Sequence, residues 1–212
     1  LSASLRDIQP RLLICDQARH DRLPADAWPA GCDCLVVDGP NGGWVELTAS
    51  GGPTYSTPPL AASDPALILF TSGATSQAKG VLSNQRAVCQ ALYNIDFIGA
   101  ISAMTSQQAV QKMMASGLMP TTLTAVPLFH VSGLHAQLLV SLRHGRRLVF
   151  MHRWDSAQAL QLIQQEKVTQ FNGAPSMVQQ LLNQDAFHDP AISGSLMGLG
   201  FGGAGLSQKL IE

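Results

Sequence analysis

Short apolar runs alternate with amphipathic stretches along most of the 212-residue chain. Runs rich in Leu, Ile, Val and Phe predict buried strands at residues 12–15, 35–38, 67–70, 123–126, 148–151, 168–171 and 196–201. Apolar residues at helical spacing predict helices at residues 84–98, 103–117, 134–142, 155–163 and 175–182. This alternation predicts an α/β fold, with mixed, mostly parallel sheets flanked by helices.

Residues at the expected helix ends support these assignments. Asn84 and Asp155 are good N-caps, because their side chains can accept hydrogen bonds from free backbone N–H groups. Pro175 suits a first helical turn, and Gly99 is expected to end the helix that Asn84 begins.

A stretch rich in Pro and Gly, residues 51–63, predicts a boundary within the chain. We therefore expect a leading α/β segment with its linker at residues 1–63, followed by an α/β core at residues 64–212. The core looks truncated at its C-terminal end, because the apolar helical pattern there has no stop signal.

Composition excludes several classes of partner and site. The 13 basic and 14 acidic residues are spread along the chain, which disfavours nucleic acid as a partner. We found no uninterrupted apolar run of about 18 residues and no signal peptide, so we expect no transmembrane segment and a cytoplasmic location. The four cysteines lack zinc-site spacing, so we expect reduced thiols and no metal bound by them.

The segment "TSGATSQAKG", residues 71–80, carries the clearest candidate chemistry. Its hydroxyls, small residues and single Lys79 follow a buried strand and suit a polyphosphate. The candidate ligand-binding residues are Thr71, Ser72, Gly73, Ala74, Thr75, Ser76 and Lys79. A polar turn between two strands is the alternative. The segment is not a P-loop, because Ala78 and Gly80 flank the lysine and an extended stretch precedes the next helix.

The order of strand, hydroxyl-rich loop, lysine, short strand and helix resembles the phosphate loop of the acyl-adenylate-forming superfamily. Three further segments follow in the order of that family: "AVPLFHVSG" at 125–133, "VTQFNGAPSMVQQLL" at 168–182 and "GLGFGGAGLS" at 198–207. The resemblance implies that His130 and Gly133 lie at the acyl pocket. It also implies that the backbone of Gly202, Gly203 and Ala204 contacts adenine. A structural histidine is the alternative for His130.

The resemblance implies an acyl-CoA ligase that uses ATP, Mg²⁺ and CoA, with Lys79 stabilising phosphate charge. The partner is a fatty or aromatic carboxylic acid whose identity these residues do not specify. Ser76, Ala78 and Gly205 depart from the family pattern, so a degenerate nucleotide-binding or interaction module of the same fold is the alternative. A different phosphate-binding α/β protein is a third reading.

The family places a Thr-Glu pair for phosphate and Mg²⁺, a ribose-binding aspartate and a catalytic lysine after the region that resembles this chain. We therefore expect residues 1–212 to carry no complete catalytic set and to be inactive alone. Because a truncated sheet leaves apolar surface uncovered, we also expect self-association into a homo-oligomer.

Overall fold

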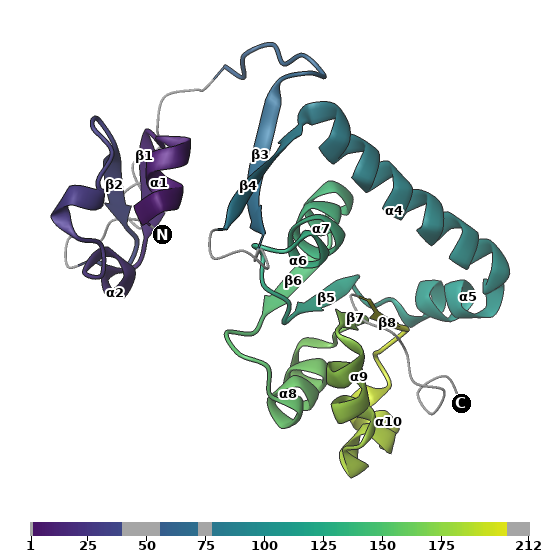
Figure 1. The fold of residues 1–212 in the computed structure, drawn as a ribbon. Helices are drawn as coiled ribbons and strands as arrows, with labels where there is room; N and C mark the ends of the chain where they lie inside the picture. The colour runs from purple at the N-terminus through teal and green to yellow at the C-terminus, as the bar shows by residue number, and fades with distance from the viewer. Residues whose placement is uncertain (1, 40–55, 72–77, 203–212) are drawn as a thin grey trace. The chain divides into compact units, whose positions relative to one another are not determined.

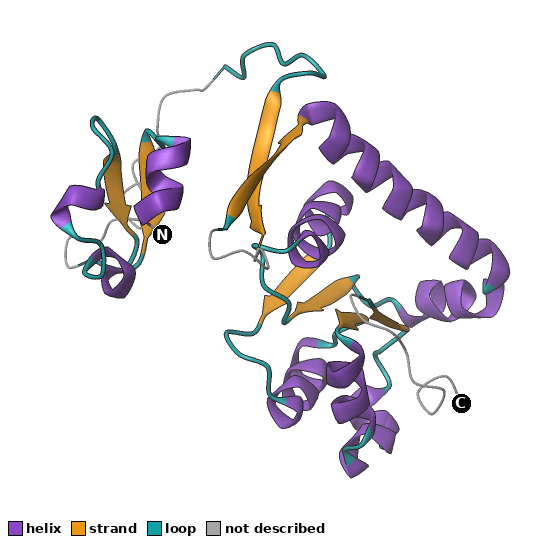
Figure 2. Cartoon of the chain, in the orientation of Figure 1, coloured by secondary structure: helices purple, strands orange, loops and turns teal. Residues whose placement is uncertain are grey.

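The structure is a computed structural model that describes residues 2–39, 56–71 and 78–202. The described chain divides into two compact units, residues 1–61 with 70–82, and residues 62–69 with 83–212. Figure 2 shows the helices and strands of both. The expected division at residue 63 stays a prediction about domain organisation.

The first unit contains a small parallel sheet. Its elements are α1 (Ser2–Ile8), β1 (Leu12–Cys15), α2 (Gln17–His20), the 3₁₀ turn η1 (Ala25–Ala27) and β2 (Asp33–Val36). Strands β1 and β2 pair in parallel from Leu12 opposite Asp33 to Cys15 opposite Val36. The strand predicted at residues 35–38 therefore begins two residues earlier than expected. The Cys15 and Cys34 sulfurs lie 3.8 Å apart, and both are free cysteines in the structure.

A two-stranded sheet of β3 (Pro65–Thr71) and β4 (Lys79–Asn84) flanks the segment singled out in the sequence. Helix α4 (Gln85–Thr105) follows, and the Asn84 side chain caps it by accepting a 2.8 Å hydrogen bond from the Ala87 N–H. The predicted stop at Gly99 is wrong: α4 continues to Thr105, because a single glycine in a helix interior costs only about 1 kcal/mol. Helix α5 (Gln107–Ser116) ends at Gly117, which adopts the left-handed conformation.

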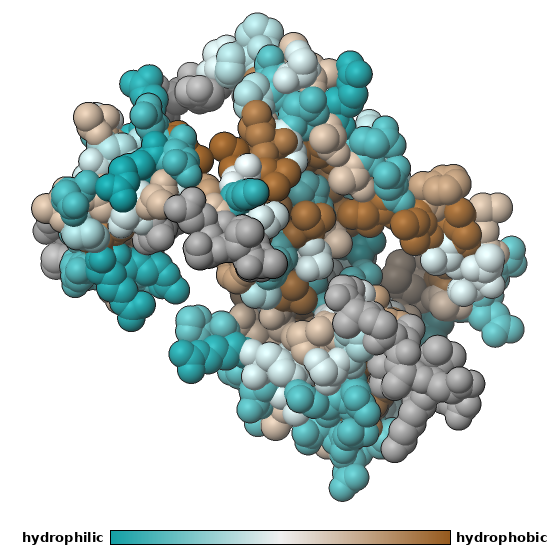
Figure 3. Space-filling model, in the orientation of Figure 1, coloured by the Kyte–Doolittle hydropathy of each residue, from teal (hydrophilic) through white to brown (hydrophobic). Residues whose placement is uncertain are grey.

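Helix α4 bears on the expectation that the chain has no transmembrane segment, which stays a prediction. Among the described residues it is long and apolar enough, by length and composition alone, to cross a membrane, although Arg86 and Asp96 interrupt its apolar residues. Core helices of soluble proteins meet the same two criteria. Apolar side chains are exposed along it, visible as brown surface in Figure 3.

The second unit is built on a four-stranded, wholly parallel sheet in the order β6-β5-β7-β8. Its strands are β5 (Thr121–Thr124), β6 (Arg147–Phe150), β7 (Gln170–Gly173) and β8 (Gly198–Phe201). Strand β5 begins two residues earlier than its apolar run predicts, and β7 and β8 begin two residues later. The paired backbone and the apolar run therefore overlap only in part.

Helices cover this sheet on both faces (Figure 1). On one face lie α8 (Ser156–Glu166), α9 (Pro175–Leu182), the 3₁₀ turn η3 (Asp185–His188) and α10 (Pro190–Ser193). On the other lie α6 (Val131–Gly133), the π-helix η2 (Leu134–Leu139) and α7 (Val140–His144). Asp155 caps α8 as predicted, accepting from the Gln158 N–H at 2.7 Å.

The core of the second unit lies between the sheet and α8 and α9. Its fully buried residues are Leu123, Ala159, Leu160, Ile163, Val168, Phe171, Val178 and Leu181. Trp154 covers this core, stacked on Phe171 with ring centroids 5.3 Å apart. The α/β fold with parallel sheets is therefore as predicted, and the opposite face of the sheet is left for a pocket.

Candidate functional site

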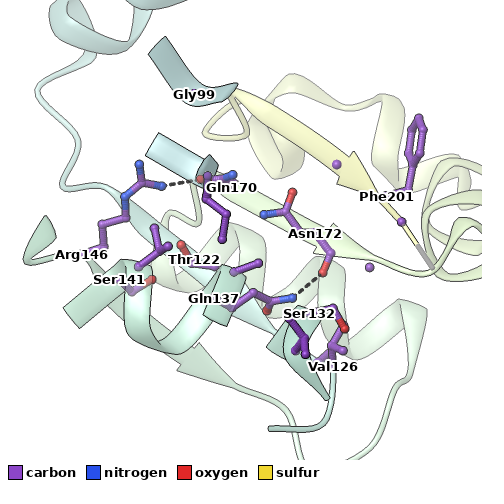
Figure 4. A pocket seen from close by; sticks show the side chains of 18 of the residues that line it. Gly99, Thr122, Val126, Ser132, Gln137, Ser141, Arg146, Gln170, Asn172 and Phe201 are labelled. Carbon is purple, nitrogen blue, oxygen red and sulfur yellow. Dashed lines mark hydrogen bonds between the residues drawn. The ribbon is translucent and has the colours of Figure 1, made fainter. Parts of the chain in front are cut away.

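A pocket of about 1180 Å³ lies in the second unit, on the sheet face opposite the core (Figure 4). It follows the strands from their amino ends, at Thr122 and Gln170, to their carboxyl ends, at Gly173 and Phe201. Its volume slightly exceeds the usual range for small-molecule sites, about 300 to 1000 Å³. Parallel α/β sheets bind ligands outside the carboxyl ends of their strands. In this fold a ligand is therefore expected at the carboxyl end of the pocket.

The central strands present opposite chemistry on their two faces. Leu123 of β5 and Phe171 of β7 point into the apolar core. Their neighbours Thr122, Gln170 and Asn172 line the pocket, as alternation along a strand requires. A parallel strand buried on both faces is ordinarily apolar throughout. The polar side chains on one face therefore mark it as the face that meets a ligand.

Strand β8 contributes a nearly bare wall. Gly198 and Gly200 pair with Gln170 and Asn172 and so share their face of the sheet. A Cβ atom built on Gly200 would lie 2.0 Å from Asn172 Oδ1, so the asparagine side chain occupies the space that the glycine leaves. Gly200 thus makes room for the Asn172 side chain on the pocket face of the sheet.

The π-helix η2 forms the opposite wall with its neighbours. Gln137, which is 1% exposed, donates a 3.0 Å hydrogen bond from Nε2 to the backbone carbonyl of Asn172. Figure 4 shows this bond joining the helix to the sheet. The irregular turn thereby places an amide side chain on a strand, and π-helical turns are frequent at functional sites. The neighbouring His135 is buried, which lowers the pKa of its imidazole.

Helix α4 lines the end of the pocket that lies at the amino ends of the strands. It contributes Ile95, Asp96, Gly99 and Ala103. Asp96 accepts from His144 Nε2 at 2.7 Å and pairs with Arg143 Nε at 3.1 Å. The hydrogen bond from His144, with the charges of both partners, lowers the pKa of the Asp96 carboxyl. Asp96 is thus ionised at neutral pH and joins α4 to α7.

Arg146 lies at the same end, immediately before β6. Its Nη1 donates a 2.5 Å hydrogen bond to Gln170 Oε1 on β7. Since β5 lies between β6 and β7, the arginine side chain crosses the strand that carries Thr122. The pocket therefore has charged side chains, Asp96 and Arg146, at its amino end and glycines at its carboxyl end.

Two of the residues singled out from the sequence line this pocket together. His130 and Gly202 both lie at its carboxyl end. The His130 carbonyl accepts from the N–H groups of Gly133 and Leu134, at 3.1 and 2.8 Å, so its backbone begins α6. Its ring is exposed and lies 4.7 Å from the Phe129 ring, centroid to centroid. Contact of His130 with an acyl group stays a prediction.

Gly133 has a packing role instead of a place in the pocket wall. A Cβ atom built on it would lie 2.3 Å from the Pro127 carbonyl oxygen. Only glycine lets α6 approach the Val126–Pro127 backbone this closely, and those two residues do line the pocket. The predicted influence of Gly133 on a substrate would then act through Val126 and Pro127.

Thr71 and Lys79, from the segment predicted to bind phosphate, belong to the first unit. Thr71 ends β3, and its Oγ1 donates a 3.4 Å hydrogen bond to the carbonyl of Lys79, the exposed first residue of β4. The remaining predicted ligands Ser72, Gly73, Ala74, Thr75 and Ser76 lie outside the described residues, as do Gly203 and Ala204. Their roles stay predictions.

Sequence reasoning missed the polar face of the pocket. Gln137 and Arg146 were not singled out, and Gln170 and Asn172 appear in the prediction only as part of the family-like segment 168–182, without a role in a site. The signal was present in "TTLT" and "QFNG", where polar residues flank the single large apolar residue of a central strand. Among the described residues, no group of three or more His, Cys, Asp or Glu side chains could hold a metal ion.

Comparisons with known proteins find relatives named as CoA ligases. Over 191 residues the chain is 29% identical to the 4-coumarate–CoA ligase-like 5 of Oryza sativa subsp. japonica, an alignment that covers 87% of this chain and 33% of that protein. It is 27% identical over 210 residues to the indoleacetate–CoA ligase of Aromatoleum aromaticum, covering 97% of this chain and 37% of that protein. The chain thus spans about a third of the length of these relatives.

Two solved structures show the same fold. The inhibitor-bound N-terminal domain of FACL13 from Mycobacterium tuberculosis superposes with a TM-score of 0.72 at 20% identity, covering 99% of this chain and 49% of that one. ATP-bound MatB from Rhodopseudomonas palustris superposes with a TM-score of 0.69 at 23% identity, covering 96% and 37%. The sequence profile described as AMP-binding enzyme matches residues 1–212, so the chain belongs to the AMP-binding enzyme family of acyl-adenylate-forming ligases.

Proposed function

We propose that this protein activates a carboxylic acid with ATP and transfers the acyl group to CoA. The carboxylate oxygen attacks the α-phosphorus of ATP, the bond to pyrophosphate breaks, and an acyl-adenylate forms. The CoA thiolate then attacks the acyl carbonyl and AMP leaves. The observation that carries the proposal is the pocket at the carboxyl ends of β5, β7 and β8, in a chain that matches the AMP-binding family throughout.

Each set of residues has one physical task in this proposal. Lys79 and the preceding hydroxyls neutralise phosphate charge, because positioned donors and cations stabilise the charge that develops in such transfers. The pocket receives the acyl group, with His130 at its mouth and the Gly202 backbone towards the nucleotide. A carboxylate is already ionised at neutral pH, so no general base is required. We assign no Mg²⁺ ligand among the described residues.

The test is acid-dependent exchange of labelled pyrophosphate into ATP, measured on the protein at its native length with a panel of fatty and aromatic acids. Trapping of the adenylate with hydroxylamine provides a second readout. Replacing Lys79 by Ala is expected to lower exchange at subsaturating ATP by about 100-fold, the usual loss for a removed stabilising donor. Lys112→Ala, at an exposed lysine on α5, is the matched control.

Two outcomes would contradict the proposal. Equal exchange by the Lys79→Ala variant and the unmodified protein would remove Lys79 from the phosphate site. Binding of ATP without exchange for any acid would support the alternative, a nucleotide-binding module of this fold without ligase activity. Residues 1–212 alone are expected to show no exchange in the same assay, because the family's Thr-Glu pair, ribose-binding aspartate and catalytic lysine are not recognisable in them.

A further inference from the structure

The amino end of the pocket contains a cation whose only recorded side-chain partner is neutral. Arg146 is the one arginine or lysine among the described lining residues. It is half-buried, and its recorded hydrogen bond goes to the amide oxygen of Gln170. A guanidinium has five N–H donors in a planar fork, so most of its donor capacity is available to a ligand.

The acidic groups near Arg146 are already engaged elsewhere. Asp96, which also lines this end, is held by Arg143 and His144. Glu166 is paired with Arg147, the next residue along the chain. Because a partly buried charge is unfavourable without a partner, the pocket would gain from a ligand that brings a negative charge to Arg146.

The bond to Gln170 also fixes where such a ligand would bind. It holds the guanidinium over the strand that carries Thr122, and Figure 4 shows Arg146 at one side of the pocket and Phe201 at the other. The Gln170 amide nitrogen, which has no recorded partner, offers a further donor at the same place. Two neighbouring side chains that line this end of the pocket therefore offer N–H groups to a ligand.

We infer that the Arg146 and Gln170 end of the pocket binds a second carboxylate of the substrate, so that the acid activated by this protein is a dicarboxylate. The inference rests on the proposed function, which puts the reacting carboxylate at the His130 and Gly202 end. Along β7, Gln170 and Gly173 are three residues apart, a separation of about 10 Å. Octanedioate, in an extended conformation, places its carboxylates at a comparable distance.

A purely structural role for Arg146, bracing β6 against β7, makes a different prediction. If Arg146 only joined the two strands, replacing it would lower the free energy of unfolding but would not change the relative affinities for different acids. A carboxylate subsite would discriminate between octanedioate and octanoate, which differ by one anionic group at the far end. Omega-hydroxyoctanoate separates charge from polarity, because it carries a neutral hydroxyl at the same position.

The experiment is isothermal titration calorimetry of these three acids into the native-length protein in the absence of ATP, so that binding is measured without turnover. We expect octanedioate to bind about tenfold more tightly than either of the others, as for one charge-assisted contact. Arg146→Met should remove this preference and Arg146→Lys should retain part of it. Arg147→Met is the matched control, because Arg147 is the adjacent arginine and pairs with Glu166 outside the pocket lining.

Each result decides the question. Equal affinity for octanedioate and octanoate in the unmodified protein, or no binding of either, would overturn the inference even if Arg146→Met did not fold. A preference that survives in a folded Arg146→Met protein would also overturn it. An Arg146-dependent preference without pyrophosphate exchange would support the subsite while refuting the proposed function, so the two failures are distinguishable.

Discussion

Replacing Gly133 by Ala is the sharpest test of how α6 packs against the pocket. The added Cβ would lie 2.3 Å from the Pro127 carbonyl oxygen and 2.8 Å from both the Pro127 carbonyl carbon and the Val126 oxygen. All three neighbours are backbone atoms, so the clash cannot be relieved by a side-chain rotation. Either α6 or the Val126–Pro127 segment must move.

Overpacking of this kind typically costs about 1 to 3 kcal/mol, and a clash with backbone belongs towards the upper end of that range. For a chain of this size, about 2 kcal/mol corresponds to a fall of roughly 4 to 8 °C in Tm. Because Val126 and Pro127 line the pocket, the displacement should also raise the KM for the acid.

Differential scanning calorimetry and urea denaturation would measure the loss of stability. Gly99→Ala is the matched control, since it is also a glycine to alanine change in a helix and nothing lies within 4 Å of its Cβ position. That variant should gain stability, by about 0.5 to 1 kcal/mol. Equal midpoints for Gly133→Ala and the unmodified protein would refute the steric reasoning.

Three further outcomes are expected. Asp155→Ala removes the cap of α8 and should lower the free energy of unfolding by about 1 kcal/mol in urea denaturation, whereas Asp155→Asn should largely preserve it. Burial depresses the pKa of His135 below its ordinary value of 6.5, so the folded state resists a proton that the unfolded state accepts. The stability of the folded state should therefore be fully present above about pH 6.5 and should decline as the pH falls below it. A His135→Gln variant whose free energy of unfolding has the same pH dependence would contradict this. Gly200→Ala should displace the Asn172 side chain, which is half-buried, and change the acid preference while shifting Tm little; a large fall in Tm would show that the strand cannot adjust.

The sequence predicted the elements whose signals are local. Asn84 and Asp155 cap helices as expected, and α9 has the predicted bounds, Pro175–Leu182, because proline and capping residues act within one turn. Gly99 misled, since its preference for helix ends is weaker than the continued helical pattern on both sides. The strand bounds shifted by about two residues, because pairing depends on neighbouring strands and not on the apolar run itself.

The site was only partly predictable for a related reason. His130 and Gly202 were found through ordered motifs, and both line the pocket. Arg146 and Gln170 are 24 residues apart in the chain and meet only because β6 and β7 flank β5. Single-sequence patterns contain no register between strands, so a contact of this kind becomes visible only in the folded sheet.

The division of the central sheet into an apolar face and a polar face has a consequence for how such a protein can change. Substitutions at Thr122, Asn172 or Gly200 alter the lining of the pocket, while Leu123 and Phe171 on the reverse side keep the fold. Because side chains that alternate along a strand point to opposite faces, a substitution in the pocket leaves no void in the core, so new acid preferences can arise with little loss of stability. Successive residues of one strand, which face the pocket and the core in turn, can therefore evolve at different rates.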